Sequence, residues 1–190
     1  PSVIVESDPS ATFLPINDAN GKKVGEVELS LTRNYISRYD KKIDKIIIGI
    51  SDSKTFPEMA DEFMKDGSQS SAHYLVGQIE GDPEIASEKP NALLNNSGFL
   101  QFVQLDQDAY YASGVEYNDD AANKNAVSIV LVASENPLSA IGSYSTYQKS
   151  MVKKLIAHIK AEAKDDTIPV INASDLDGQP SLPKMTVTFE

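Results

Sequence analysis

The sequence predicts an α/β fold in which helices flank a mixed central β-sheet. Two short apolar runs, DKIIIGIS at 44–51 and AVSIVLVAS at 126–134, are typical of strands buried on both faces of a sheet. Two amphipathic segments, one after each run, have the periodicity of helices. A chain of 190 residues that is 41% hydrophobic can also bury a full-sized core in one domain.

The first forty residues, 1–40, are predicted to form an extended N-terminal arm that contains a hairpin. Asn20 and Gly21 mark its turn, because both residue types tolerate positive φ. Residues 41–190 are predicted to form the main domain. An inserted loop rich in Pro, Asn and Gly is expected at about 80–97, and an additional terminal strand at 184–190.

Two segments are predicted to form helices, and the first of them carries its own start and stop signals. The segment TFPEMADEFMKDG begins with Thr55 as a cap, has Pro57 early and ends at Gly67. The second helix, STYQKSMVKKLIAHIKAEAKDD, starts at Ser145 and presents one apolar face. Together with the strand-like runs, these helices predict the order β-α-β-β-β-α-β for the core.

Composition excludes several classes of function. A net charge of −11 argues against a nucleic-acid backbone or an anionic membrane as the main partner. The absence of cysteine excludes disulfides, thiolate metal ligands and cysteine nucleophiles. No apolar run reaches about 18 residues, so no membrane insertion is expected, and PSVIVESDPS lacks the features of a signal peptide.

Six segments agree in order and spacing with a known family. They are IIIGISDSK, SSAHYLVGQI, GFLQFVQLDQDAYYASG, NKNAVSIVLVAS, YSTYQKSMVKKLIAHI and IPVINASDLDGQPSLP. From Lys45 to Ser181 the chain resembles the type 2 N-acetylmuramoyl-alanine amidases, a family that includes phage amidase-type lysozymes and peptidoglycan recognition proteins. The resemblance implies the mixed sheet of an amidase-like domain.

The resemblance also implies where a zinc site would lie. Such a site holds zinc by two imidazoles and a third ligand, and an open position carries the attacking water. Here the positions of the zinc ligands are Gly49, Ala173 and, near the end of the region, Ser181. The assisting groups correspond to Ala72 and Gln179, and a histidine of the cleft corresponds to Tyr111. Glycine and alanine cannot bind a metal, so we expect no metal, no cofactor and no catalytic residue.

The chain contains only two histidines, His73 and His158. His158 lies in the middle of the second predicted helix, which the resemblance places away from the cleft. His73 lies on a predicted strand, and its counterpart in the family is not a ligand. We expect His73 to be partly buried and hydrogen-bonded within the sheet, and His158 to lie at the surface or boundary of its helix.

Other polar residues could still meet at the same cleft. Ser51 and Asp175, with Asp106 and Asp108, could form an oxygen cluster for Ca²⁺ or Mg²⁺, although these residue types also serve turns and helix caps. Tyr110 and Tyr111, with Tyr117, Tyr144 and Tyr147, could stack on a sugar or pack against a partner, or simply pack within the fold. The candidate cleft or binding residues are Ser51, His73, Tyr110, Tyr111 and Asp175.

These expectations lead to a functional hypothesis. The chain is expected to be a catalytically inactive amidase-like protein with a structural or assembly role, as a bacteriophage virion component of a tail or baseplate. It would occupy the virion and, during assembly, the host cytoplasm; a cytoplasmic protein is the alternative. Its partners would be other protein subunits, identical or different, joined by strand addition, and peptidoglycan is a further candidate. A non-catalytic peptidoglycan- or glycan-binding module and a divergent cell-wall hydrolase are the competing hypotheses.

Overall fold

The computed structural model describes residues 12–38, 42–50, 55–78, 98–110, 124–132 and 145–173. It confirms the predicted α/β class: a mixed seven-stranded sheet carries helices α1 (Phe56–Met64) and α3 (Thr146–Ala163). In spatial order the strands are β1 (Phe13–Asn17), β2 (Lys23–Leu29), β6 (Phe99–Gln101), β5 (Tyr74–Val76), β8 (Ala126–Leu131), β4 (Lys45–Ile50) and β9 (Val170–Asn172). A second, two-stranded sheet pairs β3 (Ile36–Ser37) with β7 (Gln107–Asp108).

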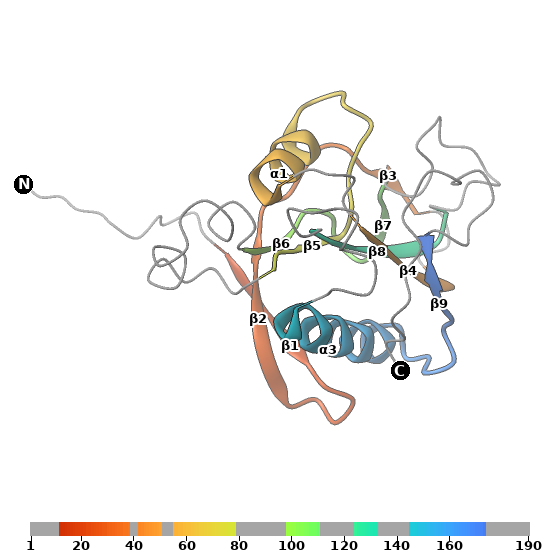
Figure 1. Ribbon diagram of the computed structural model, residues 1–190. Coiled ribbons are helices and arrows are strands. Elements are labelled where there is room, and N and C mark those ends of the chain that lie inside the picture. The colour runs from red at the N-terminus through yellow and green to blue at the C-terminus, as the bar shows by residue number, and fades with distance from the viewer. Residues whose placement is uncertain are drawn as a thin grey trace, which may run out of the picture.

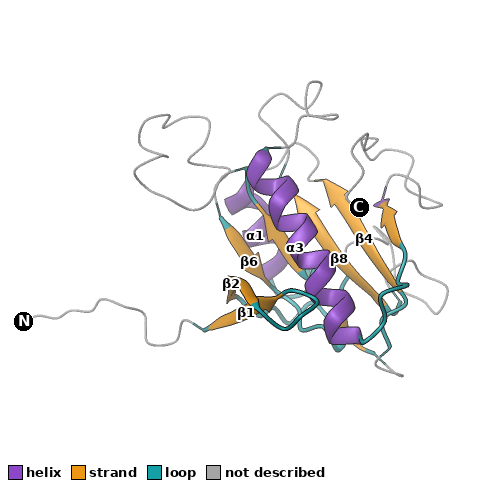
Figure 2. Cartoon of the chain, turned by 90° about the horizontal axis from the view of Figure 1, so that it is seen from below, coloured by secondary structure: helices purple, strands orange, loops and turns teal. Residues whose placement is uncertain are grey.

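The sheet separates two layers, with α1 on one face and α3 on the other (Figures 1 and 2). Along β4, Ile46, Ile48 and Ile50 pack into a hydrophobic cluster with Leu155 and other residues of α3. A second cluster contains the buried residues of α1 together with Leu75, Val130 and their neighbours. Alternate residues of a strand point to opposite faces, so each strand supplies both clusters.

The central strands form a mixed sheet, as the sequence predicts. Strand β8 lies between β5 and β4 and runs parallel to both, and β9 runs parallel to β4. Strand β6 is antiparallel to β5 and parallel to β2, which closes the hairpin with β1. The carboxyl ends of β5, β8, β4 and β9 therefore meet at one edge of the sheet.

Both helices begin with a capping box, which explains where they start. The Thr55 and Ser145 hydroxyls accept hydrogen bonds from the backbone N–H groups of Glu58 and Gln148, whose side chains bond back to the cap residues. The cap of α1 predicted from the sequence is thus confirmed. Gly67 follows the helix with φ +78, a conformation that glycine adopts without strain.

The region predicted as an arm is part of the domain from residue 12 onward. The turn of its hairpin has Gly21 at φ +80, and the Asp18 carboxylate accepts the N–H groups of Asn20 and Lys22 at 2.9 Å each. Strand β2 pairs with β6, so the hairpin belongs to the main sheet. Residues 12–38 therefore do not extend from the domain as an arm. The expected inserted loop and the terminal strand at 184–190 lie outside the described residues.

The segment after β2 is fixed to the end of α1. The Asn34 side-chain amide donates to the backbone oxygens of Phe63 and Lys65, at 2.9 and 2.8 Å. It thereby satisfies carbonyl groups that the last turn of a helix leaves without a partner. Asn34 is buried, so this contact anchors the segment between β2 and β4.

The outer edge of β1, one of the two outer strands, offers few backbone N–H groups for pairing with another strand. The N–H of Leu29 donates to the oxygen of Thr12 at 2.8 Å, and the alternation of an antiparallel ladder then turns the backbone groups of Phe13 and Pro15 outward. Proline has no N–H to offer at such a position. The Asn17 N–H donates to Nδ1 of His158 at 3.1 Å, so α3 covers this end of the edge.

The other outer strand, β9, is more open. The Ile46 N–H donates to the oxygen of Pro169 at 2.9 Å, which turns the backbone groups of Val170 and Asn172 away from β4. No strand in the described part of the chain pairs with this side. The side chain of Val170 is itself exposed.

Candidate functional site

The edge at which the parallel strands end is the natural place to look for a site. In open α/β sheets, ligands bind beyond the carboxyl ends of parallel strands. Here these ends are Val76, Leu131, Ile50 and Asn172, on four neighbouring strands. Ser51, which follows β4, and Asp175, which follows β9, lie outside the described residues, as do Tyr111, Gln179 and Ser181.

The structure places Gly49 and Ala173 next to each other. The β4–β9 ladder ends with the pair Ile48 and Asn172, and Gly49 and Ala173 are the next residue of each chain segment. Gly49 also pairs with Val130 of β8, which belongs to the cluster under α1. Gly49 thus faces the α1 side of the sheet, and both residues are buried.

His73 faces the same side of the sheet but is fully engaged there. Its Nε2 lies 2.7 Å from the carbonyl oxygen of Gln107, and its Nδ1 lies 3.1 Å from the backbone nitrogen of Ser128. A carbonyl can only accept, so Nε2 carries the proton and Nδ1 accepts from Ser128. Neither ring nitrogen has a lone pair left for a metal. The expectation of a hydrogen-bonded His73 is met, and its side chain is buried rather than partly so.

Burial also keeps the His73 ring neutral. The pKa of His73 is lowered to about 3, mainly because burial removes the hydration of the charged ring; the bond to Gln107 acts in the opposite direction, and the positive charge of Arg38 adds to the lowering. A neutral ring is the form that the two hydrogen bonds require. The histidine therefore acts as a fixed link between β5, β7 and β8.

A buried ion pair lies beside this histidine. Arg38 Nε donates to the Asp108 carboxylate at 2.8 Å, and the side chains of the two residues are 0% and 2% exposed. The guanidinium also donates to the backbone oxygens of Leu105, Gln107 and Ala126. Asp108 in turn accepts the N–H of Asn125 at 3.1 Å. Asp108 is committed to these contacts, which argues against its expected share in a metal-binding cluster, whereas Asp106 is exposed.

His158 lies on the opposite side of the sheet. Its Nδ1 accepts the N–H of Asn17, and its side chain is buried between α3 and the hairpin. Burial lowers the pKa of His158, although Glu162 and the bond from Asn17 act in the other direction. His158 is thus a buried contact residue rather than a surface one, and the predicted position on the helix side, away from Gly49, is correct.

The described tyrosines do not gather at one place. Tyr110 follows β7, is half-buried and donates its backbone N–H to the Ser71 hydroxyl at 3.1 Å. Tyr147 lies on α3 and packs against the cluster on that face. Tyr117 and Tyr144 lie outside the described residues.

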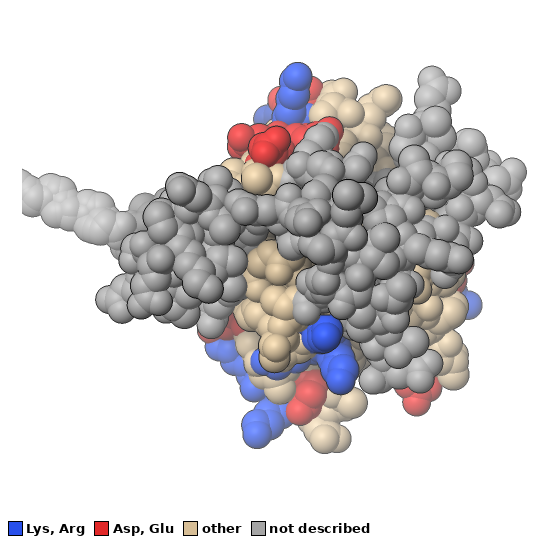
Figure 3. Space-filling model, in the orientation of Figure 1, with Lys and Arg blue, Asp and Glu red and all other residues tan. Residues whose placement is uncertain are grey.

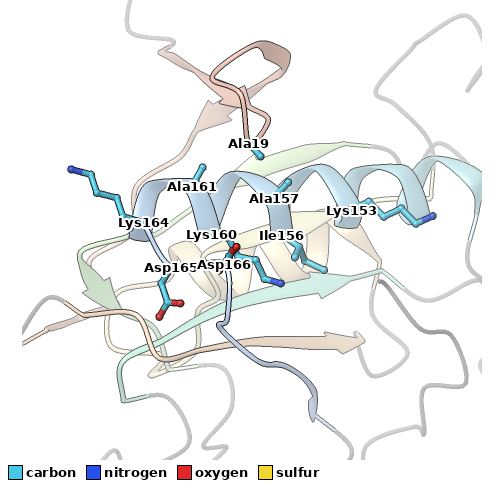
Figure 4. A pocket seen from close by; sticks show the side chains of 9 residues that line it. All are labelled: Ala19, Lys153, Ile156, Ala157, Lys160, Ala161, Lys164, Asp165 and Asp166. Carbon is cyan, nitrogen blue, oxygen red and sulfur yellow. The ribbon is translucent and has the colours of Figure 1, made fainter.

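A roomy cavity of the described part of the chain lies elsewhere. About 730 Å³ in volume, it runs along the outer side of α3 near the hairpin turn at Ala19, lined by Lys153, Lys160 and Lys164 among others (Figure 4). It contains neither histidine and lies on the α3 side of the sheet, opposite Gly49. We assign no amidase chemistry to this cavity.

The donor set does not fit the zinc ion that an amidase requires. Two expected imidazole positions are Gly49 and Ala173, which have no donor atom, and both histidines of the chain serve other contacts. Within the described ranges, no group of three or more His, Asp or Glu residues could hold a metal. No helix in these ranges is long and apolar enough to cross a membrane.

Comparison with solved structures identifies the architecture. A selenomethionine derivative of AmpD, an N-acetylmuramoyl-alanine amidase, superposes with a TM-score of 0.59 at 13% identity, covering 87% of this chain and 89% of AmpD. The chain has an AmpD-like amidase fold. The catalytic domain of PlyG is similar with a TM-score of 0.47 at 12% identity, over 80% of this chain and 82% of that domain. No protein-family model matches the sequence, and no curated protein does.

The comparison confirms the fold that the six segments implied. At 13% identity, the similarity to AmpD supports a shared fold and nothing about function. Sequence reasoning missed the Arg38–Asp108 pair and the two-stranded β3–β7 sheet. The partners are 70 residues apart, and no local pattern of the sequence joins them.

Proposed function

We propose that this chain is a non-catalytic member of the amidase-fold proteins that serves a structural or assembly role, as a component of a bacteriophage tail or baseplate. The observation that carries the proposal is the pair Gly49 and Ala173, neighbours on β4 and after β9 where the resemblance places two zinc imidazoles. The sheet that would position such ligands is present, and we take Gly49 and Ala173 to stand where two of them would lie.

The two histidines support the same proposal. A zinc ligand must offer a lone pair from a neutral ring to the metal. His73 uses its lone pair for Ser128 and is buried, and His158 uses that of Nδ1 for Asn17 on the other side of the sheet. Recruiting either ring would leave a buried N–H group without its acceptor, which costs about 1–3 kcal/mol.

The open edge of β9 supports an assembly role by strand addition. Val170 and Asn172 direct backbone donors and acceptors away from β4, and such an edge can pair with a strand of another subunit. The β1 edge is less suited, because Pro15 lacks an N–H and Asn17 is bound to His158. We therefore assign the predicted strand addition to β9.

Loss of hydrolysis is tested directly on the full chain. Purified protein is incubated with cell-wall peptidoglycan in a zymogram, with added zinc and then with a chelator, and a zinc amidase known to clear cell wall serves as the positive control. We expect no clearing under either condition. Clearing that the chelator abolishes would overturn the proposal and restore the hydrolase hypothesis.

A gain-of-binding variant tests whether Gly49 and Ala173 occupy the old ligand positions. The double variant Gly49→His with Ala173→His should bind zinc, because neighbouring parallel strands lie about 4.8 Å apart. The single variants are the controls, and calorimetry with zinc chloride is the measurement. Equal zinc binding by the single and double variants would contradict the assignment of these positions.

A third experiment separates assembly from wall binding. The protein is mixed with insoluble cell wall and pelleted, and its partners are sought by immunogold labelling of phage particles. We expect label on the tail or baseplate and no retention on the wall. Retention without label would favour the binding-module hypothesis instead.

A further inference from the structure

A small cavity of about 370 Å³ lies at the start of β6. Its residues come from five elements: Phe13 (β1), Glu26 and Glu28 (β2), Phe99 and Leu100 (β6), Phe56 (α1) and Tyr147 (α3). The cavity is three strands away from Gly49, since β5 and β8 separate β6 from β4. It is therefore distinct from the candidate zinc position. Its volume lies within the range of sites that hold small groups.

The packing at Gly98 shapes one wall of this cavity. Gly98 has φ +138, and a Cβ at this position would lie 2.7 Å from ring atoms of Phe56. A side chain there would displace the ring of Phe56. Glycine thus lets this ring pack against the backbone just before β6, where it lines the cavity.

Phe13 and Glu28 form an aromatic and acidic pair in the cavity lining. They are directly opposite each other on β1 and β2, so their side chains lie on the same face of the sheet. Phe13 is 55% exposed, which leaves its ring open to a ligand. Glu28 is half-buried, and the described residues include no ion pair for its carboxylate, whereas Glu26 pairs with Lys23.

The chemistry of the lining favours one class of ligand. The two carboxylates only accept hydrogen bonds, and the rings of Phe13, Phe56 and Phe99 offer apolar surface. A sugar presents donors and acceptors together and would find few donors here. A lysine or arginine side chain only donates, has an alkyl stem for the rings, and carries the charge that the carboxylates and aromatic faces attract.

We propose that this cavity receives a lysine or arginine side chain of a protein partner. The proposal rests on the assembly role proposed above, because it names the chemistry of the partner. Electrostatics favour it, since a chain with a net charge of −11 attracts basic surfaces over a long range. On the face shown in Figure 3, side chains of both charges lie on the described surface.

The test uses the full chain labelled with ¹⁵N and three capped tripeptides as probes, Gly-Lys-Gly, Gly-Arg-Gly and Gly-norleucine-Gly. We expect saturable shifts at the amides of Phe13, Gly98 and Phe99 with the basic peptides and none with norleucine. The variant Glu28→Gln should weaken binding about tenfold, since a charge-assisted bond is lost. Phe13→Ala should weaken it about two- to fivefold through the lost ring contact.

Glu162→Gln is the matched control, because it removes the same charge from an exposed position on α3. It should change the affinity less than about twofold, as distant exposed charges are screened by salt. If Glu28→Gln and Glu162→Gln lost equal affinity for the basic peptides, the binding would reflect the net charge of the chain and not this cavity, which would overturn the proposal. Equal binding of norleucine, or tighter binding of free lysine than of the peptide, would also overturn it.

The two proposals can fail separately. Chelator-sensitive hydrolysis of peptidoglycan would refute the proposed assembly role, but saturable binding of the basic peptides to the cavity could still be observed. Conversely, a protein without hydrolysis that ignores all three peptides would retain the assembly role and lose this cavity as its contact. Unchanged far-ultraviolet circular dichroism of each variant ensures that a lost signal is not lost folding.

Discussion

The two faces of the central sheet are built differently. Under α3, strand residues such as Ile46, Ile129 and Leu131 meet an apolar helix face in a cluster of hydrophobic residues. The α1 side combines an apolar cluster with buried polar groups, among them His73 and Ser128. The α3 face is mainly apolar, although it also buries His158, whereas the α1 side retains several buried polar contacts on the side to which Gly49 belongs.

Arg38→Ala should have the largest effect, because it breaks the polar contacts of the α1 side at their most buried point. Removing the guanidinium leaves the Asp108 carboxylate buried without its partner, which costs about 3–5 kcal/mol of unfolding free energy. Urea denaturation measures the loss. Arg33→Ala is the control: Arg33 lies 3.7 Å from Asp66 in an exposed pair and should cost less than about 1 kcal/mol.

Leu155→Ala tests the α3 face in the same assay. Leu155 is fully buried in the apolar cluster, so its truncation should cost about 2–5 kcal/mol through lost burial and a new cavity. The loss should be the same at pH 7 and pH 5, because no titratable group is exposed by the change. A loss that varies strongly with pH would show that the two faces are not independent.

Acid should destabilise the protein through the α1 side. His73 has a pKa of about 3 in the folded protein and an ordinary pKa of 6.5 in the unfolded chain, so the unfolded state holds more protons between these values. Its contribution to stability is complete above pH 6.5 and is lost as the pH falls toward 3. At pH 4.5 the titration of His73 lowers the free energy of unfolding by about 2–3 kcal/mol relative to its value above pH 6.5.

The variant His73→Asn isolates this contribution from that of other groups. Its unfolding free energy should fall less between pH 7 and pH 4.5 than that of the unchanged protein, because the titrating ring is gone. His158→Asn is the comparison on the α3 face, where burial also lowers the pKa. An identical pH dependence of His73→Asn and the unchanged chain would refute the assignment.

The smallest expected effects come from the helix caps. Ser145→Ala and Thr55→Ala each remove the side-chain acceptor for the N–H of the third helical residue, at a cost of about 0.5–2 kcal/mol. We expect similar losses for the two helices in thermal unfolding. A much larger loss for Ser145→Ala would show that the start of α3 has a role beyond capping.

The sequence predicts the elements of this fold better than its contacts. Buried strands are indicated by apolar runs, and the start of the first helix by Thr55, because these signals are local; the capping role of Ser145 was not predicted. The partnership of Gly49 and Ala173 followed only from the family resemblance, since nothing in either residue indicates it. Arg38 and Asp108 could not be paired from sequence, because their contact depends on the antiparallel pairing of β3 with β7.

The position of β8 has a consequence for synthesis on the ribosome. This strand separates β4 from β5, yet it leaves the ribosome after both of them. Until residues 126–131 emerge, β4 and β5 lack the strand that joins them, and the two halves of the sheet cannot unite. The nascent chain thus carries exposed strand edges late into translation, a state in which chaperones are expected to bind it.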